Sequence, residues 1–248
     1  MRDPGPAPLP ARSVLLSVLL GSHPPRLAVR TLVRTAELFG ISEGTARVAL
    51  SRLTADGEVV TGDGTYGLSA RHLERQQVQD RALRPATRPW RGSWDLAVLL
   101  TEQDGRMTAL NPASRRVLEL RRMAELRPGV WTRPANLEPP PGDTPPGGVV
   151  LWAGRPQAGR PAAFELVRRL WDLPAWALRA ERLMDDLADA SEPAVRLGVA
   201  AAMVRHIRSD PVLPAPLLPA GWPGARLRKA YDGYRAELGR LIATAQGT

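Results

Sequence analysis

The sequence predicts a mainly α-helical protein with a smaller α+β part, and three observations support this. Through residues 11–56 and again beyond residue 162, apolar residues recur three and four positions apart, which is the spacing of one helix face. A strong hairpin signal, Asp63-Gly64 between short β-prone runs, follows the first three helical stretches. Three short apolar runs, near Trp94, Trp131 and Trp152, are typical of buried strands and place the α+β part in the middle of the chain.

Length and composition limit the kind of protein. The 248 residues allow about one to three domains, and the net charge of +9 favours an anionic partner, nucleic acid before an acidic membrane. The absence of cysteine excludes disulfides, thiolate metal sites and cysteine nucleophiles, and it fits a cytoplasmic protein. The three histidines lie far apart in sequence, so we expect no metal and no cofactor.

The N-terminal region predicts three helices and a hairpin. Residues 1–10 are rich in proline and are expected to form a disordered tail. Residues 14–20 form an apolar run that is too short to span a bilayer and has no cleavage site after it, so we expect a buried helix and no membrane partner. Helices are expected over about 11–20, 28–39 and 42–56, and a hairpin over 58–68. Together they predict a winged helix-turn-helix domain over residues 11–70.

The third of these helices has the pattern of an element that reads DNA. Ser42 is a good N-cap, and Ala46, Leu50 and Leu53 fall on one buried face. The opposite face is small in the middle and cationic at its edges, as a helix entering a major groove requires. The candidate DNA contacts are Ser42, Gly44, Thr45, Arg47, Val48, Ser51 and Arg52 on this helix, and Arg30 and Arg34 on the helix before it.

Each candidate has an expected role and a simpler alternative. Arg47 and Arg52 are the expected base readers, while Ser42 and Thr45 suit a phosphate at the helix N-terminus. The alternative is an ordinary surface helix whose arginines are solvated. Lys229 is the only lysine, so arginine is the usual basic residue of this chain and composition alone could place Arg47 and Arg52 there. The hairpin turn, residues 63–65, has no arginine, so the sequence gives no basis for a DNA contact there.

The middle of the chain predicts a connector and a small α+β domain. Residues 71–83 read as a solvated connector helix within a 71–92 linker that prolines end. Within residues 93–158 we expect strands at 94–101, 129–132 and 149–152, a helix at 111–126, and a flexible Pro/Gly segment at 138–148. Asn111 and Pro112 are the expected N-cap and first position of that helix. This order predicts a domain of split βαβ type.

The C-terminal region, residues 159–248, is expected to form a helical domain with a proline-spaced segment at 210–219. The chain has seven tryptophans and only two phenylalanines, and an arginine near tryptophans can bind a phosphate or carboxylate. The alternative for the tryptophans, and the more common one, is a place in the core, and Arg205 could equally brace the proline-spaced segment. The candidate residues for a small effector are Trp131, Trp171, Trp176, Arg205 and His206.

The order of these motifs resembles the PaaX family of bacterial transcriptional repressors. The resemblance covers about residues 11–240 and rests on ARVALSRLTADGEVV at 46–60, SWDLAVLL at 93–100, and the C-terminal motifs WDL at 171–173, RHIR at 205–208 and DPVLPAPLLPAGWPG at 210–224. The arginine-poor hairpin and the Pro/Gly segment at 138–148 depart from the family pattern. The resemblance implies a homodimer with a winged helix, a central ferredoxin-like (Cas2-like) domain and a helical C-terminal domain. It also implies double-stranded operator DNA and a small effector that releases it, an aryl-acyl-CoA in the founding branch.

The preferred function is a DNA-binding transcriptional regulator, a repressor of a catabolic operon, and not an enzyme. One alternative is a Cas2-like metal-dependent nuclease, which needs an aspartate at the end of the first central strand. Asp95 opens that strand and Asp104 follows it after a gap, without a second carboxylate at a suitable spacing. Another alternative is a winged helix that makes only protein contacts, which the salt dependence of DNA binding would distinguish.

Overall fold

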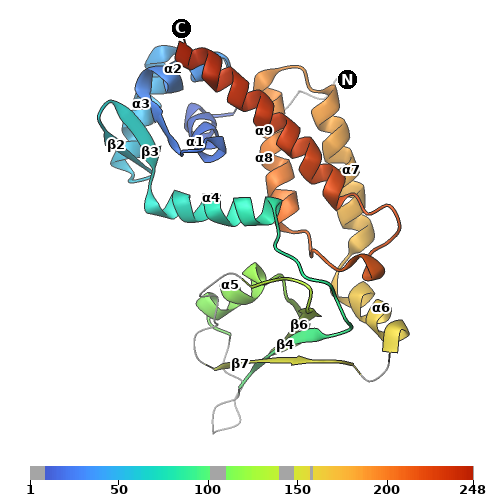
Figure 1. Ribbon diagram of the computed structural model, residues 1–248. Coiled ribbons are helices and arrows are strands. Elements are labelled where there is room, and N and C mark those ends of the chain that lie inside the picture. The colour runs from blue at the N-terminus through green and yellow to red at the C-terminus, as the bar shows by residue number, and fades with distance from the viewer. Residues whose placement is uncertain (1–8, 101–109, 140–147, 157–158, 248) are drawn as a thin grey trace, which may run out of the picture. The chain divides into compact units, whose positions relative to one another are not determined.

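The structure, a computed structural model, describes residues 9–100, 110–139, 148–156 and 159–247 (Figure 1). Most of the expected tail, most of the Pro/Gly segment and Asp104 lie outside the described residues. The chain forms two compact units from alternating stretches of sequence. Unit 1 is Met1–Leu83, Leu178–Arg208 and Pro223–Thr248, and unit 2 is Arg84–Ala177 and Ser209–Trp222. No helix in the described residues is both long and apolar enough to cross a membrane.

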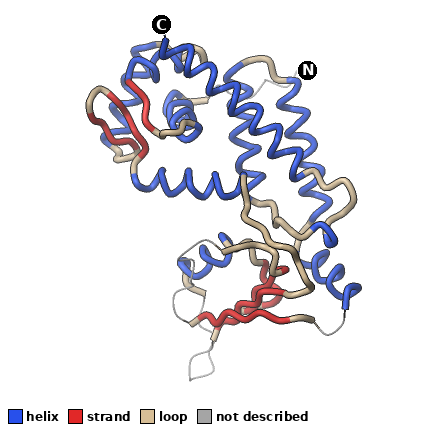
Figure 2. The backbone as a smooth tube through the Cα atoms, in the orientation of Figure 1, coloured by secondary structure: helices blue, strands red, loops and turns tan. Residues whose placement is uncertain are grey.

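The N-terminal part of unit 1 contains the three expected helices and the expected hairpin. Figure 2 shows this part as mainly helical with one small sheet. Asp63 and Gly64 both have positive φ, 50° and 69°, which is the backbone of the tight hairpin turn predicted for Asp-Gly. The elements are α1 (Ala11–Gly21), α2 (Val29–Glu37), α3 (Glu43–Ala55), β2 (Val59–Gly62) and β3 (Thr65–Leu68).

Helix α1 is the centre of unit 1. Val14, Leu15, Val18 and Leu19 are at most 1% exposed, so this helix is buried on nearly every side. It packs against α2, α3 and β3 and also against α4, α8 and α9. The apolar run at residues 14–20 is therefore a buried helix, as predicted, and forms the middle of the core of unit 1.

A short strand, β1 (Arg26–Ala28), was not predicted. It pairs antiparallel with β3, with Arg26 opposite Gly67, and completes a three-stranded sheet of order β1-β3-β2. The backbone N–H of Val29 also donates to the carbonyl of Gly64 at 3.0 Å, which ties the start of α2 to the hairpin turn. The sequence did not predict this strand, because three residues are too few to show a strand period. The residues that pair with it also lie about 40 positions away in sequence.

Helix α4 (Ala70–Leu83) corrects the prediction of a solvated connector. One side of it is buried, and it includes His72, Gln76 and Gln79. The Gln76 amide donates to the carbonyl of Leu20, in the last turn of α1, and to that of Ser22, the residue after the helix. A buried glutamine is stable there because its donors satisfy backbone carbonyls that the end of α1 leaves free.

Unit 1 is completed by C-terminal helices, so the segment expected as one C-terminal domain contributes to both units. The guanidinium of Arg196 on α8 binds both carboxylate oxygens of Glu237 on α9, at 3.1 and 2.7 Å. The same group donates to the carbonyls of Leu187 and Ala190 at the end of α7. One arginine thus joins three helices, which are α7 (Leu173–Asp189), α8 (Pro193–Arg208) and α9 (Gly224–Gly247).

Unit 2 is built on a four-stranded antiparallel sheet of order β5-β6-β4-β7. Ala97, Leu118, Met123 and Trp131 form an apolar cluster between this sheet and α5. Trp94 belongs to a second cluster with residues of α6, α7 and the proline-spaced segment. The elements are β4 (Trp94–Leu99), α5 (Pro112–Leu120), β5 (Ala124–Arg127), β6 (Val130–Pro134), β7 (Val149–Gly154), α6 (Gly159–Leu170) and η1 (Ala215–Leu217).

The helix predicted over residues 111–126 is shorter than expected. Asn111 caps it as predicted, with its side-chain oxygen accepting the Ser114 N–H at 2.7 Å. The helix ends at Leu120, Arg122 takes a left-handed φ of 54°, and the chain continues as β5. No glycine or proline marks this end in the sequence, and Met123 and Leu126 continue the helical spacing, so the prediction of a longer helix was wrong.

Arg133 on β6 holds several segments of unit 2 together. It is only 1% exposed, and its guanidinium donates to the carbonyls of Pro134, Arg121 and Val212 and to the side-chain oxygen of Asn136. Burial lowers the pKa of Arg133 to about 10, so the group remains charged at neutral pH. It joins β6, the end of α5 and the proline-spaced segment.

Replacing Arg133 with methionine should destabilise unit 2. Arg133→Met keeps much of the apolar stem but leaves several buried acceptors without a donor, at a cost of about 3–5 kcal/mol. The measurement is urea unfolding followed by tryptophan fluorescence. Arg127→Met, an exposed arginine on β5, is the matched control and should change stability little. Equal stability of the two variants would show that the buried network contributes nothing.

Candidate nucleic-acid interface

Helix α3 presents the surface that the sequence predicted. Ala46, Leu50 and Leu53 are fully buried, with no exposed area, while Val48 on the other side is 53% exposed. Gly44 and Ser51 are exposed beside Val48, and a Cβ added at Gly44 would meet nothing within 4 Å. The outer face of α3 is therefore low in the middle, and an approaching surface can come close to its backbone.

The two arginines on α3 are exposed, but they are held differently. The Arg47 Nε donates to the Glu43 carboxylate at 2.8 Å, one helical turn earlier, and both side chains are 56% exposed. Among the described residues, no carboxylate lies within ion-pair distance of Arg52. An exposed ion pair of this kind contributes about 0.3–0.5 kcal/mol to stability. Breaking it so that Arg47 can bind an anionic partner therefore costs little.

The start of α3 is capped as predicted. The Ser42 hydroxyl accepts the Thr45 N–H at 3.3 Å and lies 2.9 Å from the Thr45 hydroxyl. Arg30 on α2 is exposed, whereas Arg34 is half-buried and its Nη1 lies out of solvent without a partner in the described residues. Arg30 is thus placed for an external contact, and Arg34 would have to move to make one.

Arg12 connects α3 and the hairpin to the start of α1. Its guanidinium binds Asp56, just after α3, and Glu58, just before β2, the latter at 2.7 Å. The hydrogen bond from Arg12 lowers the pKa of Glu58. On the other side of Glu58 lies His72 of α4, 3.6 Å away, and burial lowers the pKa of His72. These groups fix the base of the hairpin relative to α3.

The five effector candidates are not gathered in one place. Trp131 packs in the cluster under α5, and the Arg115 guanidinium lies 5.3 Å from the centre of its ring. Trp171 packs against the other cluster of unit 2, and Trp176 stacks on Trp222 with ring centroids 4.6 Å apart. Arg205 and His206 lie on the last turn of α8, in unit 1.

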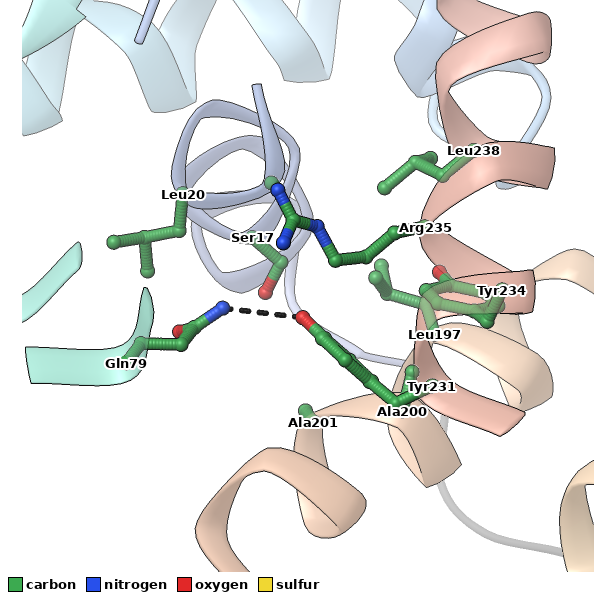
Figure 3. Close-up of a pocket in the computed structure, with 11 residues that line it drawn as sticks. Ser17, Leu20, Gln79, Leu197, Ala200, Ala201, Tyr231, Tyr234, Arg235 and Leu238 are labelled. Carbon is green, nitrogen blue, oxygen red and sulfur yellow. Dashed lines mark hydrogen bonds between the residues drawn. The ribbon is translucent and has the colours of Figure 1, made fainter. Parts of the chain in front are cut away.

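A small pocket lies inside unit 1 instead, between α1, α4, α8 and α9. Figure 3 shows Gln79 and Tyr231 directed at each other across it, joined by a 3.1 Å hydrogen bond. Burial raises the pKa of Tyr231 to about 12. The pocket volume is about 50 Å³. A cavity of about 150 Å³ is needed to hold benzene, so this pocket is far too small for an acyl-CoA.

The described residues contain no group of three or more histidines, aspartates and glutamates that could hold a metal ion. Asp95, the carboxylate considered for a nuclease, lies on β4 opposite Arg133, and burial raises its pKa. Asp104 is outside the described residues. The described part of the chain therefore gives the nuclease alternative no support.

Two regions of the chain match known protein families. Residues 10–72 match the family described as PaaX-like protein, and residues 174–244 match the PaaX-like protein C-terminal domain. The chain belongs to the PaaX family. This family is known for regulators rather than enzymes.

Among solved structures, the PaaX-family chain is similar to "Uncharacterized protein Rv0674 from Mycobacterium tuberculosis". The TM-score is 0.78 and the sequence identity is 40%, over 95% of this chain and 98% of that chain. No curated protein matches the sequence. The matched family regions contain α1 to α3 and the hairpin at one end of the chain and most of α7 to α9 at the other.

The buried histidine at the base of the hairpin should make stability depend on pH. Because His72 has a lower pKa in the folded chain than when unfolded, the unfolded state binds more protons as the pH falls below about 6.5. Stability should be constant above about pH 7 and fall below that value. His72→Gln should remove this part of the fall, which wild type keeps. Thermal melts at each pH measure it, and identical profiles for wild type and His72→Gln would contradict the assignment.

Proposed function

We propose that this PaaX-family protein is a DNA-binding transcriptional repressor that reads operator DNA with the outer face of α3. The observation that carries the proposal is the composition of that face. Gly44 and Ser51 leave room at closest approach, Val48 offers a methyl-bearing contact for thymine, and Arg47 and Arg52 flank them. Guanidinium groups at the edges can bind guanine O6 and N7. Ser42 and Thr45 suit a phosphate at the N-terminus of the helix.

The fold supports two domain assignments within this proposal. α1 to α3 and the hairpin, within residues 11–70, have the element order of a winged helix-turn-helix domain. In unit 2, numbering the strands in chain order gives the sheet order 2-3-1-4, all antiparallel, with a helix between the first two strands. This strand order supports the ferredoxin-like assignment of residues 93–158. The described residues differ from that fold in having no second helix between β6 and β7.

A repressor of this kind should act as a homodimer. One recognition helix contacts few base pairs, so one copy gives little discrimination among genomic sites. Two copies related by a twofold axis would read an inverted repeat, with half-sites about one helical turn, or a small multiple of one, apart.

The switch requires a small effector that binds the DNA-free state more tightly than the DNA-bound state. An acyl-CoA is the effector that fits the family resemblance. The candidate residues for it remain Trp131, Trp171 and Trp176 in unit 2 and Arg205 and His206 in unit 1.

Arg47 should specify a base. Arg47→Ala should cost about 1–3 kcal/mol on the specific site and relax the preference at one position. Binding is measured by fluorescence anisotropy on the promoter duplex and on a mixed-sequence duplex. An equal loss on both would instead make Arg47 a phosphate contact.

Glu43 provides a matched test of the same position. Glu43→Gln frees Arg47 and removes a negative charge from the interface, so it should tighten DNA binding. Asp232→Asn, at an exposed site on α9, makes the same charge change and is the control. If both variants gain the same DNA affinity, the gain comes from the change in net charge, and the Glu43–Arg47 ion pair does not affect DNA binding.

The experiment that tests the whole proposal is a footprint on the protein's own promoter region, repeated with a panel of acyl-CoA thioesters. We expect protection of an inverted repeat and its loss with one thioester. By linkage, promoter DNA must then weaken binding of that thioester by the same factor. Absence of any protected site would contradict the proposal, and equally tight binding to a lone half-site would contradict the dimer.

A further inference from the structure

The hairpin without an arginine of its own carries one from another strand. Arg26 on β1 is exposed, and its side chain lies over Gly67 of β3 and reaches Thr65 beside the hairpin turn. Its Nη1 donates to the Thr65 hydroxyl at 2.9 Å, and that hydroxyl donates to the Gly62 carbonyl at 2.6 Å. The guanidinium is therefore fixed beside the turn formed by Asp63 and Gly64.

Two glycines lie under the Arg26 guanidinium. A Cβ added at Gly67 would lie 3.4 Å from three atoms of the guanidinium, Cζ, Nε and Nη2. A Cβ at Gly62 would lie 3.8 Å from Nη1. Both glycines lie on the hairpin strands, so the guanidinium rests on their bare backbone. A larger side chain at Gly67 would occupy the space that the group now fills.

The charge of Arg26 is not neutralised in the described part of the chain. No described carboxylate lies within ion-pair distance of it, in contrast to Arg12 and Arg47, which are both paired. The hydrogen bond to Thr65 uses one of five N–H donors, and the others have no acceptor among the described residues. A fixed, unpaired and exposed guanidinium is suited to an anion, because little conformational entropy remains to be lost on binding.

The position of Arg26 is rigid relative to the proposed reading helix. The Leu68 N–H donates to the Pro25 carbonyl and the Val29 N–H donates to the Gly64 carbonyl, so the strand is bonded to the hairpin on both sides of Arg26. The hairpin is joined to α3 through Glu58, Asp56 and Arg12. A phosphate contact at Arg26 would therefore fix the register of α3 on a duplex.

From these contacts we infer that Arg26 is a DNA-phosphate contact and gives the hairpin the cation that its own sequence lacks. The inference rests on the proposed function, since it assumes that the unit binds duplex DNA. It assigns Arg26 to positioning rather than to base recognition. The competing role is a purely structural brace, in which Arg26 only holds Thr65 and the hairpin.

The test uses the full-length protein, a promoter duplex and a mixed-sequence duplex about three helical turns long. Dissociation constants are measured by anisotropy over a range of salt concentrations. Arg26→Ala should weaken binding to both duplexes by a similar factor and reduce the log–log salt slope by about 0.9, the contribution of one phosphate. Arg26→Lys should keep most of the slope. Arg240→Ala, an exposed arginine on α9, is the charge-matched control and should leave the slope unchanged.

Two further variants separate a DNA contact from a brace. Thr65→Val removes the hydrogen bond but keeps the guanidinium, so it should retain most of the affinity. Gly67→Val fills the space under the guanidinium without changing the net charge. It should displace the guanidinium and weaken DNA binding. Circular dichroism checks that the variant is folded. The contact is refuted if Arg26→Ala keeps the wild-type slope, or if Thr65→Val loses as much affinity as Arg26→Ala. If wild type itself shows no salt-dependent binding, the proposed function has failed rather than this inference alone.

Discussion

The burial of α1 is the constraint on which unit 1 depends. Val14, Leu15, Val18 and Leu19 have almost no exposed surface, and the helix packs against α2, α3 and β3 as well as α4, α8 and α9. The inner residues of α3 rest on this helix and on α2, which leaves the outer face of α3 exposed. The same helix contacts the C-terminal helices, so the proposed DNA-reading surface and the C-terminal third share one core.

The arginines of this chain divide by their surroundings. Arg133 and Arg196 bind backbone carbonyls or a carboxylate inside the fold and act as braces. Arg12 joins α1 to the end of α3 and the hairpin. Arg26, by contrast, has an exposed guanidinium with no described carboxylate partner, and Arg47 has only a weak exposed one. These roles cannot be told apart from the net charge of +9 or from residue type, because nearly every basic residue is arginine.

Sequence reasoning succeeded where local periodicity decides the structure. The buried positions of α3, the caps at Ser42 and Asn111 and the Asp63-Gly64 turn follow from side-chain spacing and local backbone preference. It failed where a distant partner decides. β1 exists only because β3 pairs with it, and the buried side of α4 exists because Gln76 finds carbonyls at the end of α1. A glutamine-rich helix carries no mark in its own sequence that it will be buried.

The candidate sites show the same division. The outer face of α3 could be assigned from spacing, whereas the Glu43–Arg47 ion pair, an i, i+4 contact, was not predicted. The effector residues were chosen for their chemistry alone, and the structure distributes them over two clusters of unit 2 and the end of α8. The role inferred for Arg26 depends on the position of its guanidinium over Gly62 and Gly67, which could be seen only once the pairing of β1 with β3 was known.

The most direct test of the central claim, that α3 enters the major groove, is photo-crosslinking from position 48. Val48 is replaced by a photoreactive amino acid in the full-length protein, which is then irradiated on its promoter duplex. Leu178, an equally exposed apolar residue on α7, is the control position. The account predicts an adduct from position 48 at bases within the protected site and none from position 178. Binding of the duplex without an adduct from position 48 would contradict it.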